Sequence, residues 1–264
     1  MRGIQKAVVA SLFFSASVAT FAQAGGAAAQ KCSATQLQQL GAQLGVARFT
    51  QTETGVVVSA ACKVWPKDAS KAIVAVAYAT KEEDKKGLVV AVTDVATGKL
   101  VNLHRELFQE DAAMEFRESS LRIDTARYDL APGVRAFAVD MQSGGPGASC
   151  PDGGQGPVRS LFVQQGEKLQ KVLDGLDMAP WHFVSGGPAM CVGDKEVTVV
   201  EEFPASIDIA DSSTNGFADL IIKMVSKLDN GAKSKRKAFQ YTLKFDGKQY
   251  PVETMHAAFL KWRE

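Results

Sequence analysis

The chain has 264 residues, enough for one large domain or two small ones, and its 30 basic residues almost balance its 29 acidic ones. This near-neutral charge gives no electrostatic reason to expect nucleic acid or an anionic membrane as a partner. Beyond the N-terminal segment no apolar run approaches the roughly 18 residues of a membrane-spanning helix, so none is expected in the mature protein.

The N-terminal segment has the pattern of a secretory signal peptide. Arg2 and Lys6 give a positive start, residues 7–21 are apolar, and residues 22–24 (Ala-Gln-Ala) have the small-x-small form of a cleavage site. The apolar run is too short to span a bilayer. We therefore expect a signal peptide over residues 1–24 and a mature protein that works in the periplasm or, alternatively, is secreted.

A short helix is expected near the start of the mature protein, after a flexible leader of Gly, Ala and Gln over residues 25–31. Three leucines recur at helical spacing within residues 33–46, and Ser33 or Thr35 is placed to cap the first turn. The apolar stripe predicts a helix that packs on the core.

The middle of the chain has the pattern of strands joined by tight turns. Runs rich in Val and Ile alternate with turns such as Thr97-Gly98 and Asp246-Gly247, which are strong hairpin signals. The expected strands cover residues 71–78, 87–93, 100–104, 121–124, 134–140, 158–163, 169–173, 196–200, 220–225, 238–245 and 249–252.

These elements predict a mainly β fold in one domain over residues 32–264, with short N- and C-terminal helices. Antiparallel hairpin units fit either a β-propeller-like or a β-sandwich arrangement. Two halves that meet near residues 175–195 are the alternative to a single domain. Segments 122–141 and 206–225 align without a gap, each with Ile-Asp, a loop that contains Gly and a strand, and this predicts a structural repeat.

Residues 143–157 are rich in Gly and Pro and cannot form regular structure throughout. We expect a surface connection tethered by a disulfide, or alternatively the rim of a ligand site, because functional residues concentrate on such loops. At the end of the chain, Met255, Ala258, Phe259 and Trp262 fall on one helical face, which predicts a second packing helix.

The four cysteines, Cys32, Cys62, Cys150 and Cys191, form an even set in an exported protein and predict two disulfides. Three pairings are possible. We favour Cys32 with Cys62 and Cys150 with Cys191, because each pair closes a moderate loop, worth roughly 3–4 kcal/mol in the chain-entropy model. A zinc site or a catalytic thiol is the alternative, but no two cysteines have CxxC spacing.

One segment has the composition of a cation site. Asp211, Ser213, Asn215 and Asp219 place oxygen side chains at positions 1, 3, 5 and 9, and Gly216 allows a sharp turn. Calcium binds six or more oxygens, so a tight loop with this spacing predicts a calcium site. The same residue types also form turns without metal, through side-chain hydrogen bonds to the backbone.

Residues 211–222 resemble the calcium loop of FG-GAP repeats, which build β-propeller blades in integrin α-subunits and many exported bacterial proteins. The resemblance implies metal roles for Asp211, Ser213, Asn215 and Asp219. Ser213 and Asn215 stand where the family usually has stronger ligands. A glutamate at position 12, typical of an EF-hand, is replaced here by Ile222.

Signatures of catalysis are weak in this sequence. His104, His182 and His256 are far apart and show no HExxH spacing, and no GxSxG or P-loop is present. Trp65, Trp181 and Trp262 fit either core positions or platforms for a sugar ring.

The sequence thus favours an exported, non-catalytic β-rich protein that binds a protein or an envelope component, stabilised by calcium if the Asp211–Asp219 segment is a site. The alternative is a periplasmic or secreted hydrolase that acts on an envelope or extracellular polymer. A structural envelope factor without a specific ligand is a third hypothesis.

Overall fold

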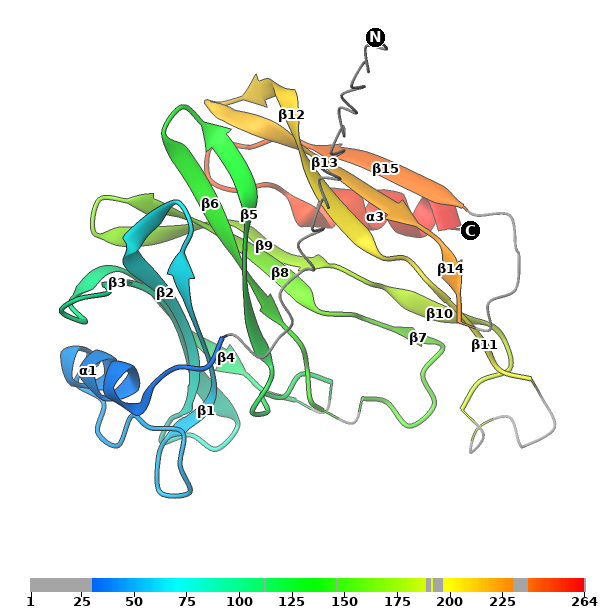
Figure 1. Cartoon of the computed structure of the whole chain (residues 1–264). Helices are drawn as coiled ribbons and strands as arrows, with labels where there is room; N and C mark the ends of the chain where they lie inside the picture. Colours follow the sequence, from blue (N-terminus) through cyan, green and yellow to red (C-terminus); the bar gives the residue numbers. More distant parts are fainter. Residues whose placement is uncertain are drawn as a thin grey trace, which may run out of the picture.

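The computed structural model of the protein describes residues 30–111, 113–145, 147–188, 191, 197–229 and 237–263. The predicted signal peptide, residues 1–24, lies outside these ranges, as do residues 25–29 of the expected leader. The described part of the chain is mainly β and built of antiparallel hairpins, with a short helix near each end (Figure 1). The predicted fold class is therefore confirmed.

The largest sheet combines two antiparallel runs of four strands. The first run contains β1 (Val57–Trp65), β2 (Asp68–Ala79), β3 (Lys85–Asp94) and β4 (Leu100–Gln109). The second contains β5 (Leu121–Ala131), β6 (Val134–Met141), β8 (Val158–Gln165) and β9 (Lys168–Asp177). The runs join along β4 and β9, which lie parallel with Leu103 opposite Lys168. The outer strands β1 and β5 also approach each other, so the sheet is nearly closed and barrel-like (Figure 1).

The strand β2 shows why its sequence is a continuous apolar run. Successive side chains of a strand point to opposite faces. Ile73 and its alternate neighbours face the interior of the large sheet, where they pack with Trp65 and Phe137. Val74 and its alternate neighbours face outward and pack with Leu37 and Leu40. Both faces are covered, so both sets of positions are apolar.

The helix α1 (Ala34–Leu44) covers the outer face of this run. Ser33 caps its start, and the side chain of Gln36 bonds back to the Ser33 backbone to complete a capping box. Gly45 ends the helix in the left-handed conformation, with φ of 68°. The predicted helix and its Ser33 cap are confirmed.

Two smaller sheets and a second helix complete the described fold. The three-stranded sheet contains β12 (Ala205–Thr214), β13 (Phe217–Val225) and β15 (Ala238–Leu243). The other sheet has the order β14 (Lys227–Leu228), β11 (Val199–Glu202), β10 (Trp181–Ser185) and β7 (Gly153–Gly154). The helix α3 (Val252–Arg263) lies between the three-stranded sheet and the strands β8 and β9 (Figure 1).

One hydrophobic cluster joins these parts. It contains Leu173 of β9, Leu220 of β13 and Phe259 of α3. The chain on either side of residues 175–195 therefore contributes to the same core, and the two halves suggested by the sequence are packed together.

Both disulfides have the predicted pairing. Cys32 is bonded to Cys62 and Cys150 to Cys191. Structural disulfides indicate an oxidising compartment. Within the described ranges, no helix has the length and apolar character needed to cross a membrane.

The structure differs from the sequence prediction at several places. The expected strand over residues 249–252 is wrong: Tyr250 makes one isolated bridge to Leu173, and Val252 begins α3, because Pro251 has no N–H group to donate to a strand ladder. The strand β10 was not predicted. Gln30, expected in the flexible leader, exchanges hydrogen bonds of 2.7 and 2.8 Å with the backbone of Ile123 in β5. The strand β1 was not predicted, because its two alanines and Lys63 weaken its β pattern. The strand β12 was not predicted either, because its outward positions are polar and its end overlaps the expected calcium loop.

Segments 122–141 and 206–225, which the sequence aligns as a repeat, are both hairpins, each with a shifted register in its first strand.

Candidate functional site

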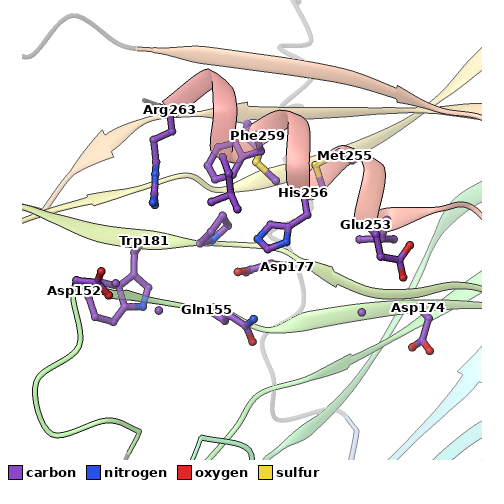
Figure 2. Close-up of a pocket in the computed structure, with 17 residues that line it drawn as sticks. Asp152, Gln155, Asp174, Asp177, Trp181, Glu253, Met255, His256, Phe259 and Arg263 are labelled. Carbon is purple, nitrogen blue, oxygen red and sulfur yellow. The ribbon is translucent and has the colours of Figure 1, made fainter.

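A cavity of about 430 Å³ lies between α3 and the strands β9 and β10 (Figure 2). We call it the α3 cavity. Residues 152–155, which include β7, line its opposite side. Its size falls within the range of ligand pockets in proteins, and it therefore becomes the candidate site.

The helix α3 supplies both an apolar floor and a polar wall. Met255 and Phe259 are buried against the core and line the floor. Glu253, His256 and Arg263 recur at spacings of three and seven residues, which places them on a neighbouring side of the helix. Figure 2 shows His256 and Arg263 pointing from the helix toward the strand side of the cavity.

Asp177, the last residue of β9, is held in the cavity by backbone hydrogen bonds. Its Oδ1 accepts hydrogen bonds of 3.0 Å from the backbone N–H groups of Gly156 and Ala179. Burial raises the pKa of Asp177, and this outweighs the effects of the two hydrogen bonds and of His256, which lower it. The surroundings of Asp177 in the free protein therefore stabilise its negative charge less well than water does.

Trp181 forms a side wall of the cavity because two glycines lie beside it. A side chain at Gly154 would lie 2.7 Å from the indole ring, and one at Gly153 would lie 2.5 Å from the Trp181 carbonyl oxygen. The absence of side chains on β7 lets the backbone pair closely with β10. The Gly-rich segment thus has a specific role, which is to seat the indole ring.

Carboxyl groups dominate the charged part of the lining. Asp152 and Glu253 are exposed, and Asp174 is paired with Lys171 at 3.1 Å. Arg263 contributes a guanidinium group to the same cavity. An indole face beside several carboxylates is suited to a cation, through charge attraction and cation–π contact. A partly buried carboxyl with a raised pKa in a cleft, such as that of Asp177, also fits a general acid.

Comparisons with models of protein families, with curated proteins and with solved structures give no match. The function of this cavity is therefore inferred from its own geometry and chemistry.

The four predicted calcium ligands lie in and around the β12–β13 hairpin rather than in an open loop. Asn215 and Gly216, with φ of 49° and 87°, form the two-residue turn. The side-chain amide of Asn215 donates a hydrogen bond of 2.8 Å to the carbonyl oxygen of Phe245. Asp211 and Ser213 are exposed.

Asp219, the fourth predicted ligand, is buried. Its Oδ2 accepts a hydrogen bond of 2.7 Å from Ser212, and its Oδ1 has no hydrogen-bond partner among the described residues. Among all the residues that the structure describes, no group of three or more His, Cys, Asp and Glu side chains is arranged to hold a metal ion. The calcium site stays a prediction.

Of the histidines and tryptophans, only His256 and Trp181 line the α3 cavity within the described ranges. His104 packs against Phe162, and His182 stacks on Phe203, whereas His256 lines the α3 cavity. Trp65 is fully buried, and Trp262 packs on the aromatic core around Phe259.

The sequence signals found part of this site and missed the rest. A ligand rim is one of the two predictions for the Gly-Pro segment, and residues 152–155 line the cavity. Asp177 carried no local signal, because its burial depends on α3, which follows some 75 residues later in the chain.

Proposed function

We propose that this protein is an exported binding protein of the periplasm, and that the α3 cavity holds a cationic group of its partner, a protein or an envelope component. The signal-peptide pattern of residues 1–24 and the two disulfides support export. Secretion to the medium is the alternative location.

The observation that supports the proposal is that the partly buried carboxyl of Asp177 and the indole of Trp181 line one cavity. Burial deprives the Asp177 carboxylate of the solvent that would stabilise its negative charge. An ammonium or guanidinium group placed there would stabilise that charge instead. The indole face would add attraction to the same cation. Asp152 and Glu253 would favour its approach.

Titration of the purified mature protein with n-butylammonium chloride at low ionic strength tests this proposal. We expect saturable binding by calorimetry, weakened about tenfold or more by Asp177→Asn, because a hydrogen bond to a charged group is lost. Asp208→Asn, an exposed aspartate on β12 that pairs with Lys223, is the matched control and should leave the affinity unchanged. Absence of binding, or equal loss in both variants, contradicts the proposal.

Binding should also weaken as the pH falls through the raised pKa of Asp177. Below that pKa the carboxyl is protonated and offers no negative charge to a cation. A neutral ligand of the same size would not show this dependence.

The second candidate function is hydrolysis of an envelope or extracellular polymer. The raised pKa of Asp177 favours it, because a general acid must hold its proton near the working pH. Other carboxyl groups of the cavity would supply the second carboxylate that glycoside hydrolysis uses. Turnover of a polysaccharide by the pure protein, abolished by Asp177→Asn, would favour this function over binding alone.

A further inference from the structure

A second cavity, of about 360 Å³, opens into the interior of the large sheet. We call it the apolar cavity. Val90 of β3, Leu121 of β5, Val139 of β6 and Phe162 of β8 line it, and all four belong to the hydrophobic cluster inside the sheet. Met141, which is partly buried, adds to the same lining. Side chains of this kind favour a hydrocarbon group over water.

The apolar cavity and the α3 cavity share a wall. Gln155, Asp174 and Gly175 line both of them. A Cβ atom added at Gly175 would have no neighbouring atom within 4 Å, so open space lies beside this residue. Its φ of 71° also disfavours any other residue there. Gly175 is also exposed, so the two cavities meet at the surface of the protein beside a residue without a side chain.

Charged residues also line the apolar cavity, namely Glu106, Lys171 and Asp174, and their balance disfavours an anionic ligand. The Nζ atom of Lys171 lies 2.8 and 3.0 Å from the two oxygens of Glu106, and 3.1 Å from both oxygens of Asp174. One ammonium group is thus held by two carboxylates. Burial raises the pKa of Glu106, but its bonds to His104 and Lys171 outweigh burial and lower the pKa to about 2. The wall keeps an excess of negative charge at neutral pH.

We propose that the two cavities together hold one amphipathic amine, with its ammonium group in the α3 cavity and its hydrocarbon chain in the apolar cavity. This inference rests on the proposed function, because it assigns the cationic group to the site beside Asp177. It adds the substrate class: the partner is a small lipid-like cation rather than a basic segment of a protein.

A chain-length series tests the inference. The dissociation constants of n-butyl-, n-hexyl-, n-octyl- and n-decylammonium are measured by calorimetry below their micelle concentrations. Each methylene that enters the apolar cavity should improve affinity about fourfold, which corresponds to about 0.8 kcal/mol. Decanoate, with the same chain and an anionic head, should bind far more weakly than decylammonium.

Two variants test whether the hydrocarbon chain of the amine lies in the apolar cavity. Met141→Trp, which fills the apolar cavity from a partly buried position, should remove the gain with chain length and leave the affinity for butylammonium within about twofold. Val158→Phe should act in the same way from another lining position. Unchanged butylammonium binding also reports that each variant is folded.

The outcomes separate the two proposals. Butylammonium binding without any gain in longer amines overturns the amphipathic ligand and leaves the proposed function intact. A gain with chain length that survives both filling variants overturns the apolar cavity as its cause. Decanoate that binds as tightly as decylammonium overturns the cationic head group. Failure of every amine to bind overturns the proposed function as well.

Discussion

Arg159 of β8 lies at the centre of a buried ion cluster whose removal gives the sharpest stability prediction. Its Nε and Nη2 atoms bond to the two oxygens of Asp140, at 2.6 and 2.9 Å. Its Nη1 atom lies 3.0 Å from Asp124 and 2.7 Å from the Tyr128 hydroxyl oxygen. The side chains of Arg159 and Asp140 are only 9% and 4% exposed. The change Arg159→Met keeps an apolar stem and removes the charge.

Breaking a buried ion pair by removing one partner typically destabilises a protein by about 3–5 kcal/mol, because the other charge stays buried. Arg122 still bonds to Asp140 at 2.9 and 3.2 Å in the variant, which places the expected loss near the lower end, at about 3 kcal/mol. For a domain of this size, about 1 kcal/mol shifts the midpoint by about 2–4 °C. The melting temperature should therefore fall by about 6–12 °C.

Thermal and urea unfolding of the oxidised protein measure this loss. Arg135→Met is the matched control, since Arg135 pairs with the half-exposed Asp129 in the same β5–β6 hairpin and should lose only about 0–1 kcal/mol. The double change Asp140→Leu with Arg159→Met should recover a large part of the lost stability, because it also removes the buried Asp140 carboxylate that the single change leaves unpaired with Arg159. If Arg159→Met loses no more than Arg135→Met, the reasoning from burial is wrong.

Three further predictions concern the candidate sites. Asp177→Asn keeps an acceptor for both backbone N–H groups; because burial raises the pKa of Asp177 in the folded state, the variant should be at least as stable as the parent at neutral pH. The difference should vanish below the ordinary pKa of about 3.8, and parallel pH–stability curves for the two proteins would contradict this. Gly154→Ala should displace the indole of Trp181, destabilise the protein by about 1–3 kcal/mol and change the Trp181 fluorescence, measured against Trp181→Phe; an unchanged spectrum would refute the close contact. Calcium at a hundred times its Kd should stabilise the protein by about 2.7 kcal/mol relative to chelator, and the exposed Asp211→Ala should remove the effect; equal midpoints in calcium and chelator would end the calcium hypothesis.

Some elements could be predicted because their cause is local. The α1 helix follows from its leucine spacing and from Ser33, whose hydroxyl caps the first turn. The pairing of Cys32 with Cys62 followed from loop length, and the fold places their Cα atoms 4.9 Å apart. Hairpins such as β8–β9 follow from a Gly turn between apolar runs.

The Asn215-Gly216 turn shows that one local pattern can support two predictions. Asn-Gly between two strands is the strongest short-range sign of a hairpin, and the structure has that hairpin. The oxygen-rich composition of the segment predicts either a calcium site or a turn without metal, and the calcium site stays a prediction. The polar residues of β12 are explained by exposure, since outward positions of a surface strand need no apolar side chain.

By itself the sequence indicated most of the strands and turns, the two helices, the favoured disulfide pairing and a signal peptide, because each depends on neighbouring residues or on the length of a loop; it missed β1, β10 and β12. Only the tertiary structure decided how the hairpins close, since the approach of β1 to β5 and of β4 to β9 depends on side chains far apart in the chain. The α3 cavity has the same origin: Gln155, Asp177, Trp181 and His256 come from separate segments. The raised pKa of Asp177 results from burial, which no pattern of neighbouring residues encodes.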